Sequence, residues 1–252
     1  MIRLKSKREI ETIRQAAAIL AQAFEGLKPA VRPGVTTLEL DRRAEETIRK
    51  AGGAPAFKGY RGFPKTLCVS INEEVVHGIP SLRKLKEGDL VSLDLGVKYE
   101  GYYADAARSW PAGQAAPETL RLIRAAREAF QAGLEAEKGN GRRIGDLSQA
   151  IQQAVESGGF GVVRDYVGHG IGQEIHEDPQ VPNFGRAGQG PRIEPGLVLA
   201  IEPMVTAGGY AVETLEDGWT VITKDRSWAS HYEDTVVFTE NGPVNLTGGG
   251  ME

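Results

Sequence analysis

Cysteine is almost absent from this sequence: Cys68 is the single one among 252 residues. A lone cysteine cannot form an internal disulfide bond, so nothing indicates an oxidising compartment. No run of about 18 apolar residues occurs either, which excludes a helix that spans a membrane. The first residues, M-I-R-L-K-S-K-R, are not followed by the apolar run of a secretory signal. We therefore expect a cytoplasmic protein that does not associate with membranes.

The sequence also lacks a strong charge of one sign. Its 30 Lys and Arg residues and 34 Asp and Glu residues leave a formal net charge of -4, whereas nucleic-acid-binding domains carry a clear basic excess. A specific nucleic-acid partner is therefore not expected. The basic cluster near the N-terminus is interpreted as the solvated start of a helix, and a transient ribosome contact through it is left open. It comprises Arg3, Lys5, Lys7 and Arg8.

The first part of the chain has the patterns of two helices followed by strands. Residues 6–27 place apolar side chains at spacings of three and four, and Ser6 with Glu9 matches a capping box. A second helix is predicted from near Thr37 to the glycine stop at 52–53. The β-branched and apolar content then predicts strands at 66–71, 89–97 and 102–110.

The second part of the chain repeats this order. A helix is predicted from Pro117, followed by a turn at Asn140-Gly141 and a helix over 145–157. Strands are predicted next, at 197–206, 209–214, 219–223 and 234–239.

Matching motifs show that the two parts form an internal repeat. The sequence H-G-I occurs at 77–79 and again at 169–171, and a glycine precedes Asp94 and Glu202 by six residues across an apolar strand. We expect a single catalytic domain over residues 1–252, in the α+β class, with halves at about 5–110 and 117–246. Such halves can face each other across a pseudo-two-fold axis, each supplying a strand that ends in a carboxylate.

Acidic residues in apolar strands are the first sign of chemistry. Asp94 stands in L-D-L and Glu202 in A-I-E-P-M, where a buried carboxylate is costly unless it is paired or binds a metal. Either residue alone is interpreted as a solvent-facing strand end, but equivalent positions in a repeat favour function. Two of the four histidines, His169 and His176, lie in the glycine-rich segment V-G-H-G-I-G-Q-E-I-H-E-D-P-Q-V-P.

These motifs together resemble the type I methionine aminopeptidases of the M24-like, pita-bread metallohydrolase family. The resemblance runs from about residue 5 to residue 246 and rests on five spaced residues. Asp94 and Asp105 stand 11 apart, His169 opens the long histidine motif, Glu202 lies in I-E-P-M, and Glu233 lies in H-Y-E-D-T.

The resemblance implies a pita-bread fold with an antiparallel sheet covered by helices, and a metal-dependent aminopeptidase. Such an enzyme removes the initiator methionine from nascent proteins and peptides, using a metal-bridged hydroxide that attacks the first peptide bond. The implied ligands of two divalent ions are Asp94, Asp105, His169, Glu202 and Glu233. An oxygen-rich set of this kind accepts Co, Mn, Fe, Ni or Zn and does not decide between them. A monomer is expected.

The resemblance also implies roles for residues that hold the substrate. Glu202 is the candidate proton shuttle to the leaving amine, and His77 and His176 are expected to hydrogen-bond the scissile amide. The expected pocket for the methionine side chain is apolar, aromatic and sulfur-lined, which suits a thioether. Its candidates are Tyr60, Phe63, Cys68, Trp219 and Met204, of which Phe63 and Met204 are also typical of an ordinary core. Cys68 is interpreted as a wall, since no adjacent histidine activates it.

The sequence departs from the family's pattern at three places. Asp234 follows the last glutamate where histidine is common, Ala106 follows the second aspartate where threonine is common, and Ile175 precedes His176 where an aromatic is common. These leave the implied ligands intact and bear on their surroundings.

Three alternatives remain beside this interpretation. Xaa-Pro aminopeptidases share the ligand set, but carry a large N-terminal domain that is not seen before the catalytic half here. A non-catalytic pita-bread binding module is expected to have lost ligands, and all five are present. An α+β domain with scattered surface acids leaves the long histidine motif unexplained.

Overall fold

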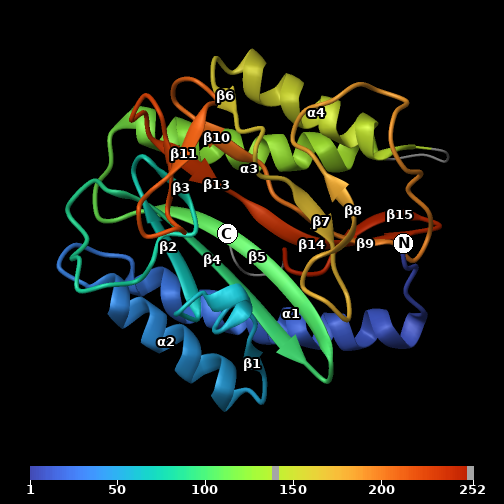
Figure 1. Ribbon diagram of the computed structural model, residues 1–252, viewed down its shortest axis with the longest axis horizontal. Coiled ribbons are helices and arrows are strands. Elements are labelled where there is room, and N and C mark those ends of the chain that lie inside the picture. Colours follow the sequence, from blue (N-terminus) through green and yellow to red (C-terminus); the bar gives the residue numbers. More distant parts are fainter. Residues whose placement is uncertain (138–141, 249–252) are drawn as a thin grey trace.

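The computed structural model in Figure 1 describes residues 1–137 and 142–248. The predicted turn at Asn140-Gly141 lies outside the described residues. The helices are α1 (Lys7–Leu27), α2 (Thr37–Lys50), α3 (Pro117–Ala136) and α4 (Ile144–Ser157), with 3-10 turns η1 (Lys28–Ala30) and η2 (Tyr60–Gly62).

Side-chain caps determine where the first two helices begin. The Ser6 backbone N–H donates to Glu9 Oε2 at 2.8 Å, and the Glu9 N–H donates to Ser6 Oγ at 3.4 Å. Thr36 and Glu39 form the same reciprocal pair, at 2.8 and 3.2 Å. Each pair satisfies backbone donors that the helix itself leaves free. The predicted capping box of the first helix is thereby confirmed.

The strands pair antiparallel throughout the described residues. The larger sheet has the order β1-β4-β5-β14-β9-β7-β8, with β2 added to β4 and β15 added to β14. Two three-stranded sheets, β13-β10-β6 and β11-β12-β3, lie beside it. The bounds are β1 (Ala54–Pro55), β2 (Leu67–Ile71), β3 (Glu74–Val76), β4 (Leu90–Tyr99), β5 (Tyr102–Pro111), β6 (Gly161–Val162), β7 (Gly168–Gly170), β8 (Glu177–Val181), β9 (Val198–Ile201), β10 (Met204–Thr206), β11 (Val212–Thr214), β12 (Val221–Thr223), β13 (Ala229–His231), β14 (Glu233–Thr239) and β15 (Gly242–Asn245).

Each half of the molecule packs its helix pair on its own strands. Helix α1 contacts β4 and β5, and α2 contacts β2, while α3 contacts β10 and β13 and α4 contacts β6. In Figure 1, α1 and α2 lie in the lower part of the molecule and α3 and α4 in the upper part. Both pairs cover the same face of the larger sheet, since Ala106 packs with the first pair and Ile201 with the second. Two large apolar clusters result, one beneath each helix pair. The predicted α+β class with helices covering an antiparallel sheet is confirmed.

One continuous strand was predicted over 197–206, and this prediction was wrong, because the structure has two strands there. β9 ends at Ile201 in the larger sheet, and β10 begins at Met204 in a three-stranded sheet. Pro203 lies between them and has no backbone N–H to donate to a sheet ladder. The chain therefore changes sheets at Glu202, which stands at the break. Among the helices of residues 1–137 and 142–248, none has the length and apolar character needed to cross a bilayer.

Candidate metal centre

Strand register brings the five predicted ligands to one face of the larger sheet. Asp94 on β4 pairs with Ala107 on β5, and Ala107 pairs with Glu233 on β14. The register of β14 on β9, in which Asp234 pairs with Ile201, continues to set Glu233 beside Glu202. Directly paired residues project from the same face. One row across the sheet thus carries three carboxylates, with the small Ala107 side chain leaving room between two of them.

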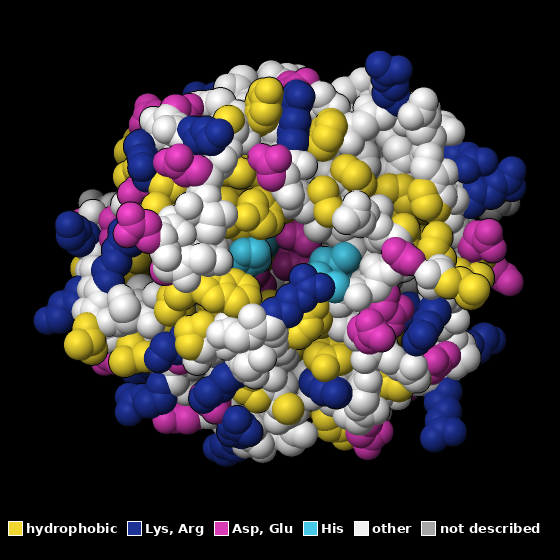
Figure 2. Space-filling model, in the orientation of Figure 1, with side chains coloured by type: hydrophobic (Ala, Val, Ile, Leu, Met, Phe, Trp, Pro, Cys, Tyr) yellow, Lys and Arg dark blue, Asp and Glu magenta, His cyan; other side chains and the backbone are white. Residues whose placement is uncertain are grey.

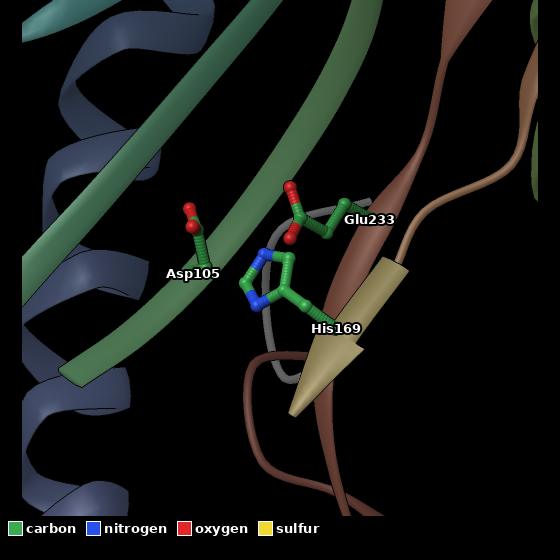
Figure 3. Close-up of side chains that lie close together, drawn as sticks. All are labelled: Asp105, His169 and Glu233. Atoms are coloured by element: carbon green, nitrogen blue, oxygen red, sulfur yellow. The ribbon is translucent and has the colours of Figure 1, made fainter. Parts of the chain in front are cut away.

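The neighbouring row supplies the other two predicted ligands. Asp105 lies two residues from Ala107 on β5, and therefore faces the same side. The Asp105 backbone N–H donates to Thr235 Oγ1 at 2.9 Å, which ties β5 to β14. His169 on β7 pairs with Ala200 on β9 and completes this row. Figure 3 shows the side chains of Asp105, His169 and Glu233 converging from their separate strands.

The carboxylates of this centre are buried and poorly satisfied. Asp105 is 3 % exposed and Glu233 is 2 % exposed. Asp94 Oδ1, Asp105 Oδ1 and Glu233 Oε1 are buried without a hydrogen-bond partner among the described residues. Burial in the native state is expensive for such groups unless a cation compensates them.

The pKa values of these carboxyl groups are raised by the same burial. Burial, followed by the neighbouring carboxylates, raises the pKa of Asp94, Glu202 and Glu233 well above the usual range. Burial raises the pKa of Asp105 to about 7. Divalent cations relieve both the desolvation and the mutual repulsion, so the residues present fit a metal centre.

Two overlapping groups of donor atoms can hold ions. In each group the donor atoms lie within 4.8 Å of one another; the first joins Asp105, His169 and Glu233, and the second joins Glu202, His231 and Glu233. His169 Nδ1 lies 3.0 Å from the Gly170 carbonyl oxygen. A carbonyl only accepts, so Nδ1 carries the proton and Nε2 presents its lone pair to the centre.

His77 and His176 lie beside the predicted ligands. The His176 ring centroid is 4.3 Å from that of His169, and its Nδ1 is 2.9 Å from Tyr60 Oη. His77 has a positive φ of 62°, a strained conformation for a residue other than glycine, and its ring stands edge-on to Trp219. Burial, followed by His176, lowers the pKa of His77 to about 4. Burial, followed by the Arg61 guanidinium, lowers the pKa of His176 to about 4.

A cavity of about 190 Å³ opens onto the cluster, and Figure 2 shows histidine and acidic side chains at the bottom of this hollow. Most of the predicted pocket residues line it, namely Tyr60, Phe63, Cys68, His77, His176 and Trp219. Phe63 and Trp219 make an edge-to-face contact with 5.1 Å between ring centroids. Cys68 pairs with Asp94 across β2 and β4, so the thiol extends the carboxylate row into the pocket wall.

Met204 is the predicted pocket residue that the structure does not bring into the cavity. Its side chain is fully buried in a separate apolar cluster with Val76 and Val221. Val76 lines the cavity, so Met204 lies in the layer behind that wall. Met204 lies on β10, which belongs to a three-stranded sheet and not to the larger sheet that carries the carboxylate row.

Several lining residues were missed by the sequence analysis. They are Phe57, Arg61, Val76, Tyr166 and Val167. Val167 is the first residue of the histidine segment and Tyr166 directly precedes it, so that extending the segment by one residue would have included both. Phe57 had no sequence signal, because it reaches the site by crossing Gly96 on β4: a Cβ at Gly96 would lie 2.9 Å from the Phe57 ring.

Two of the three departures from the family pattern, Asp234 and Ala106, lie on the face opposite the ligands, whereas Ile175 lies on the ligand face, over Gly96, which pairs with Asp105. Asp234 and Ala106 pair with each other on the opposite side of the sheet. There Asp234 accepts from Arg108 Nη2 at 2.6 Å and from Thr247 Oγ1 at 2.6 Å. Ile175 is 2 % exposed and packs over Gly96. Asp234 is thus part of a buried network beneath the centre.

Known proteins resemble this chain along its whole length. Residues 11–240 match metallopeptidase family M24. The methionine aminopeptidase of Clostridium perfringens is 53% identical over 247 residues, covering 98% of this chain and 99% of the relative. Methionine aminopeptidase 1 of Bacillus subtilis is 48% identical, with coverage of 98% and 99%.

Solved structures agree with these relatives. The methionine aminopeptidase of Thermotoga maritima superposes with a TM-score of 0.95 at 46% identity, covering 98% of this chain and 99% of that one. The prolidase of Pyrococcus furiosus gives a TM-score of 0.75 at 26% identity, and this chain covers only 65% of its length. The chain therefore has the pita-bread fold and belongs to metallopeptidase family M24, and its recognition as similar to the type I methionine aminopeptidases is confirmed.

Proposed function

We propose that this chain is a metal-dependent aminopeptidase that removes N-terminal methionine from peptides and nascent proteins. The observation that carries the proposal is a small cavity with aromatic and sulfur-containing walls that ends at a buried carboxylate and histidine cluster. Whole-length relatives at 48% to 53% identity are named methionine aminopeptidases. An aminopeptidase needs both parts together, a pocket for one side chain and a hydrolytic centre beside its carbonyl.

Two divalent ions are the proposed cofactor. Asp94, Asp105, His169, Glu202 and Glu233 would hold them, and the overlap of two donor groups at Glu233 supports a pair of adjacent ions rather than one. Four carboxylates offset the charge of two divalent cations. When bound, such ions supply Lewis-acid chemistry that activates water toward a peptide carbonyl. Oxygen-rich donors suit Mn, Fe or Co and admit Ni and Zn.

The methionine side chain is proposed to enter the cavity between Tyr60, Phe63, Cys68 and Trp219. Its thioether is unbranched and polarizable, and it makes favourable contacts with aromatic ring edges. The edge-to-face pair of Phe63 and Trp219 presents such edges. Cys68 is 4 % exposed, and burial raises the pKa of its thiol, so the side chain would act as an apolar wall.

The two histidines beside the ligands are proposed to bind the scissile amide. With pKa values near 4, both imidazoles are neutral at physiological pH and keep one N–H to donate. A neutral donor aimed at a carbonyl oxygen gains strength as negative charge develops there. Glu202, at the break between β9 and β10, is proposed to carry a proton to the leaving amine.

We further propose that the whole chain acts as one catalytic domain. Asp94 and Asp105 come from the first half, and His169, Glu202 and Glu233 come from the second. Neither half contains the complete set of ligands. A cytoplasmic location, a monomeric state and a ribosome contact through the basic N-terminus remain predictions.

Peptide hydrolysis across several divalent metals tests the proposal. Metal-loaded protein is expected to release methionine from Met-Ala-Ser and to leave Ala-Pro-Ser intact. Preference for the Xaa-Pro peptide would assign the chain to the prolidase-like branch of the family. Absence of hydrolysis with every metal, in protein shown to bind the ions, would favour a binding module.

A further inference from the structure

His231 is a buried histidine that the mechanism above does not use. It ends strand β13, where it pairs with Met204 on β10, and it is 1 % exposed. Its backbone is held on both sides by one hydroxyl: the His231 N–H donates to Ser109 Oγ at 3.0 Å, and Ser109 Oγ donates to the His231 carbonyl at 2.9 Å. Ser109 Oγ also lies 2.7 Å from Ser92 Oγ. The ring is therefore carried on a fixed backbone.

The imidazole of His231 is directed at Glu202. His231 Nε2 lies 3.7 Å from Glu202 Oε2, and His169 Nε2 lies 3.7 Å from Glu202 Oε1. The carboxylate thus stands between two imidazoles, one facing each oxygen. His231 Nε2 is buried and has no hydrogen-bond partner among the described residues. A buried ring nitrogen without a partner is unfavourable, and the nearby carboxylate oxygen is an acceptor that a small rotation would bring within reach.

We propose that His231 is a positioning residue that donates its Nε2–H to Glu202 Oε2, so that Oε1 is presented on the side of His169. This rests on the proposed function, in which Glu202 is a metal ligand and proton carrier. A ligating carboxylate at the end of a glutamate side chain needs a second partner to hold its plane. Of the two imidazoles that face the Glu202 carboxylate, His169 is itself a proposed ligand, which leaves His231 for this role.

Direct metal ligation is the competing role, because His231 shares a donor group with Glu202 and Glu233. The architecture favours positioning. The ligands Asp94, Asp105, His169 and Glu233 lie on strands of the larger sheet, whereas His231 lies on β13 in a separate three-stranded sheet. It approaches the carboxylate from outside the two ligand rows.

Three substitutions separate these roles. His231→Gln keeps an amide donor at the distance of Nε2, His231→Asn carries its donor only as far as Nδ1, and His231→Leu has none. For each variant, the number of bound Mn²⁺ equivalents is measured by titration calorimetry, and the visible spectrum is recorded for the Co²⁺-loaded protein. The kcat and KM for Met-Ala-Ser are then compared with those of the wild type, and circular dichroism verifies the fold.

The positioning role predicts that kcat falls about 10- to 100-fold in His231→Leu and His231→Asn, with KM within about threefold. His231→Gln is expected to recover most of the lost kcat, and all variants should keep the wild-type metal stoichiometry and Co²⁺ band intensity. Loss of a metal equivalent, or a changed Co²⁺ spectrum, would make His231 a ligand. Equal kcat in the Gln and Asn variants would show that His231 only packs in the core. The comparison of these two variants tests the proposal even if the Leu variant does not fold. Wild-type hydrolysis, measured first, tests the proposed function separately.

Discussion

Replacing Asp105 with asparagine is expected to stabilise the metal-free protein at neutral pH, even though it removes a proposed ligand. Asp105 is 3 % exposed, and its Oδ1 has no hydrogen-bond partner among the described residues. Asparagine has nearly the same shape, keeps an acceptor oxygen and carries no charge at any pH. The substitution therefore removes the cost of ionising a buried carboxyl and little else.

The magnitude follows from the pKa of this carboxyl, which burial raises from 3.8 to about 7. Between these values the unfolded chain has released a proton that the folded protein still holds, so the free energy of unfolding falls as pH rises. At about 1.4 kcal/mol per pH unit, Asp105 costs the wild type roughly 4 kcal/mol by pH 8. Near pH 4 both states hold the proton to a large extent, and the cost is below about 1 kcal/mol. Removing the Asp105 charge also relieves part of the repulsion that raises the pKa of Asp94, Glu202 and Glu233, which changes stability in the same direction.

Urea unfolding in EDTA, followed by tryptophan fluorescence at pH 4.5, 6 and 8, measures this difference. The advantage of Asp105→Asn should grow from about 1 to about 4 kcal/mol across the series. Saturating Mn²⁺ should reverse the order, because the wild type binds the ions more tightly and gains more stability by mass action. Asp217→Asn is the matched control: hydrogen bonds to Trp219 and Thr220 lower the pKa of Asp217, so that substitution should destabilise instead. An advantage at pH 8 that is absent, or as large at pH 4.5, would refute the reasoning.

Three further predictions concern single side chains. His77→Ala should lower kcat at least about 100-fold while the bound metal stays at the wild-type level, measured by peptide release and elemental analysis, because His77 is proposed to touch substrate and not metal. Lys5→Met should lower the free energy of unfolding by about 3–5 kcal/mol, since it strips the partner from Glu177 in an ion pair of 2.6 Å with side chains 3% and 7% exposed. The double variant Lys5→Met/Glu177→Gln should recover much of this loss in the same urea titration. Cys68 should resist a thiol reagent at pH 8 in native protein and react fully in urea, because burial, followed by Asp94, raises its pKa.

Each of these has an outcome that would contradict it. Loss of metal along with activity in His77→Ala would make that residue a ligand. No recovery in the Lys5 and Glu177 double variant would show that the loss comes from packing and not from an unpaired charge. Labelling of native Cys68 at the rate of a free thiol would mean that the pocket wall opens to solvent.

Local sequence patterns were sufficient to predict the long elements and to name the proposed ligands. The spacing of apolar residues and the Ser6 cap predict α1, and the β-branched stretch around Asp94 predicts β4, because these signals act within a few residues of the chain. The spaced motifs also named all five residues that converge on one face of the sheet. The internal repeat predicts that Asp94 and Glu202 hold corresponding positions in two halves, and in the structure both residues lie in one row across the larger sheet.

Short elements escaped the sequence for a physical reason. β7 and β13 have three residues each, too few to show an alternation of polar and apolar side chains. Their existence depends on distant partners: β7 pairs with β9, and β13 pairs with β10. The break at Pro203 had a visible signal in the proline itself, but the sheet that β10 then joins depends on its distant partners β13 and β6.

The sequence by itself thus named the residues that we propose carry the chemistry, because the type of each side chain and the short motif around it are local features of the chain. Tertiary structure alone decided how they meet. Strand register set Asp94, Glu233 and Glu202 in one row around the small Ala107, and packing of a separate sheet brought His231 against Glu202. Register and sheet packing are sums of many contacts between residues far apart in the chain. Register and sheet packing therefore cannot be predicted from a local pattern, although they determine which side chain lies beside each buried carboxylate.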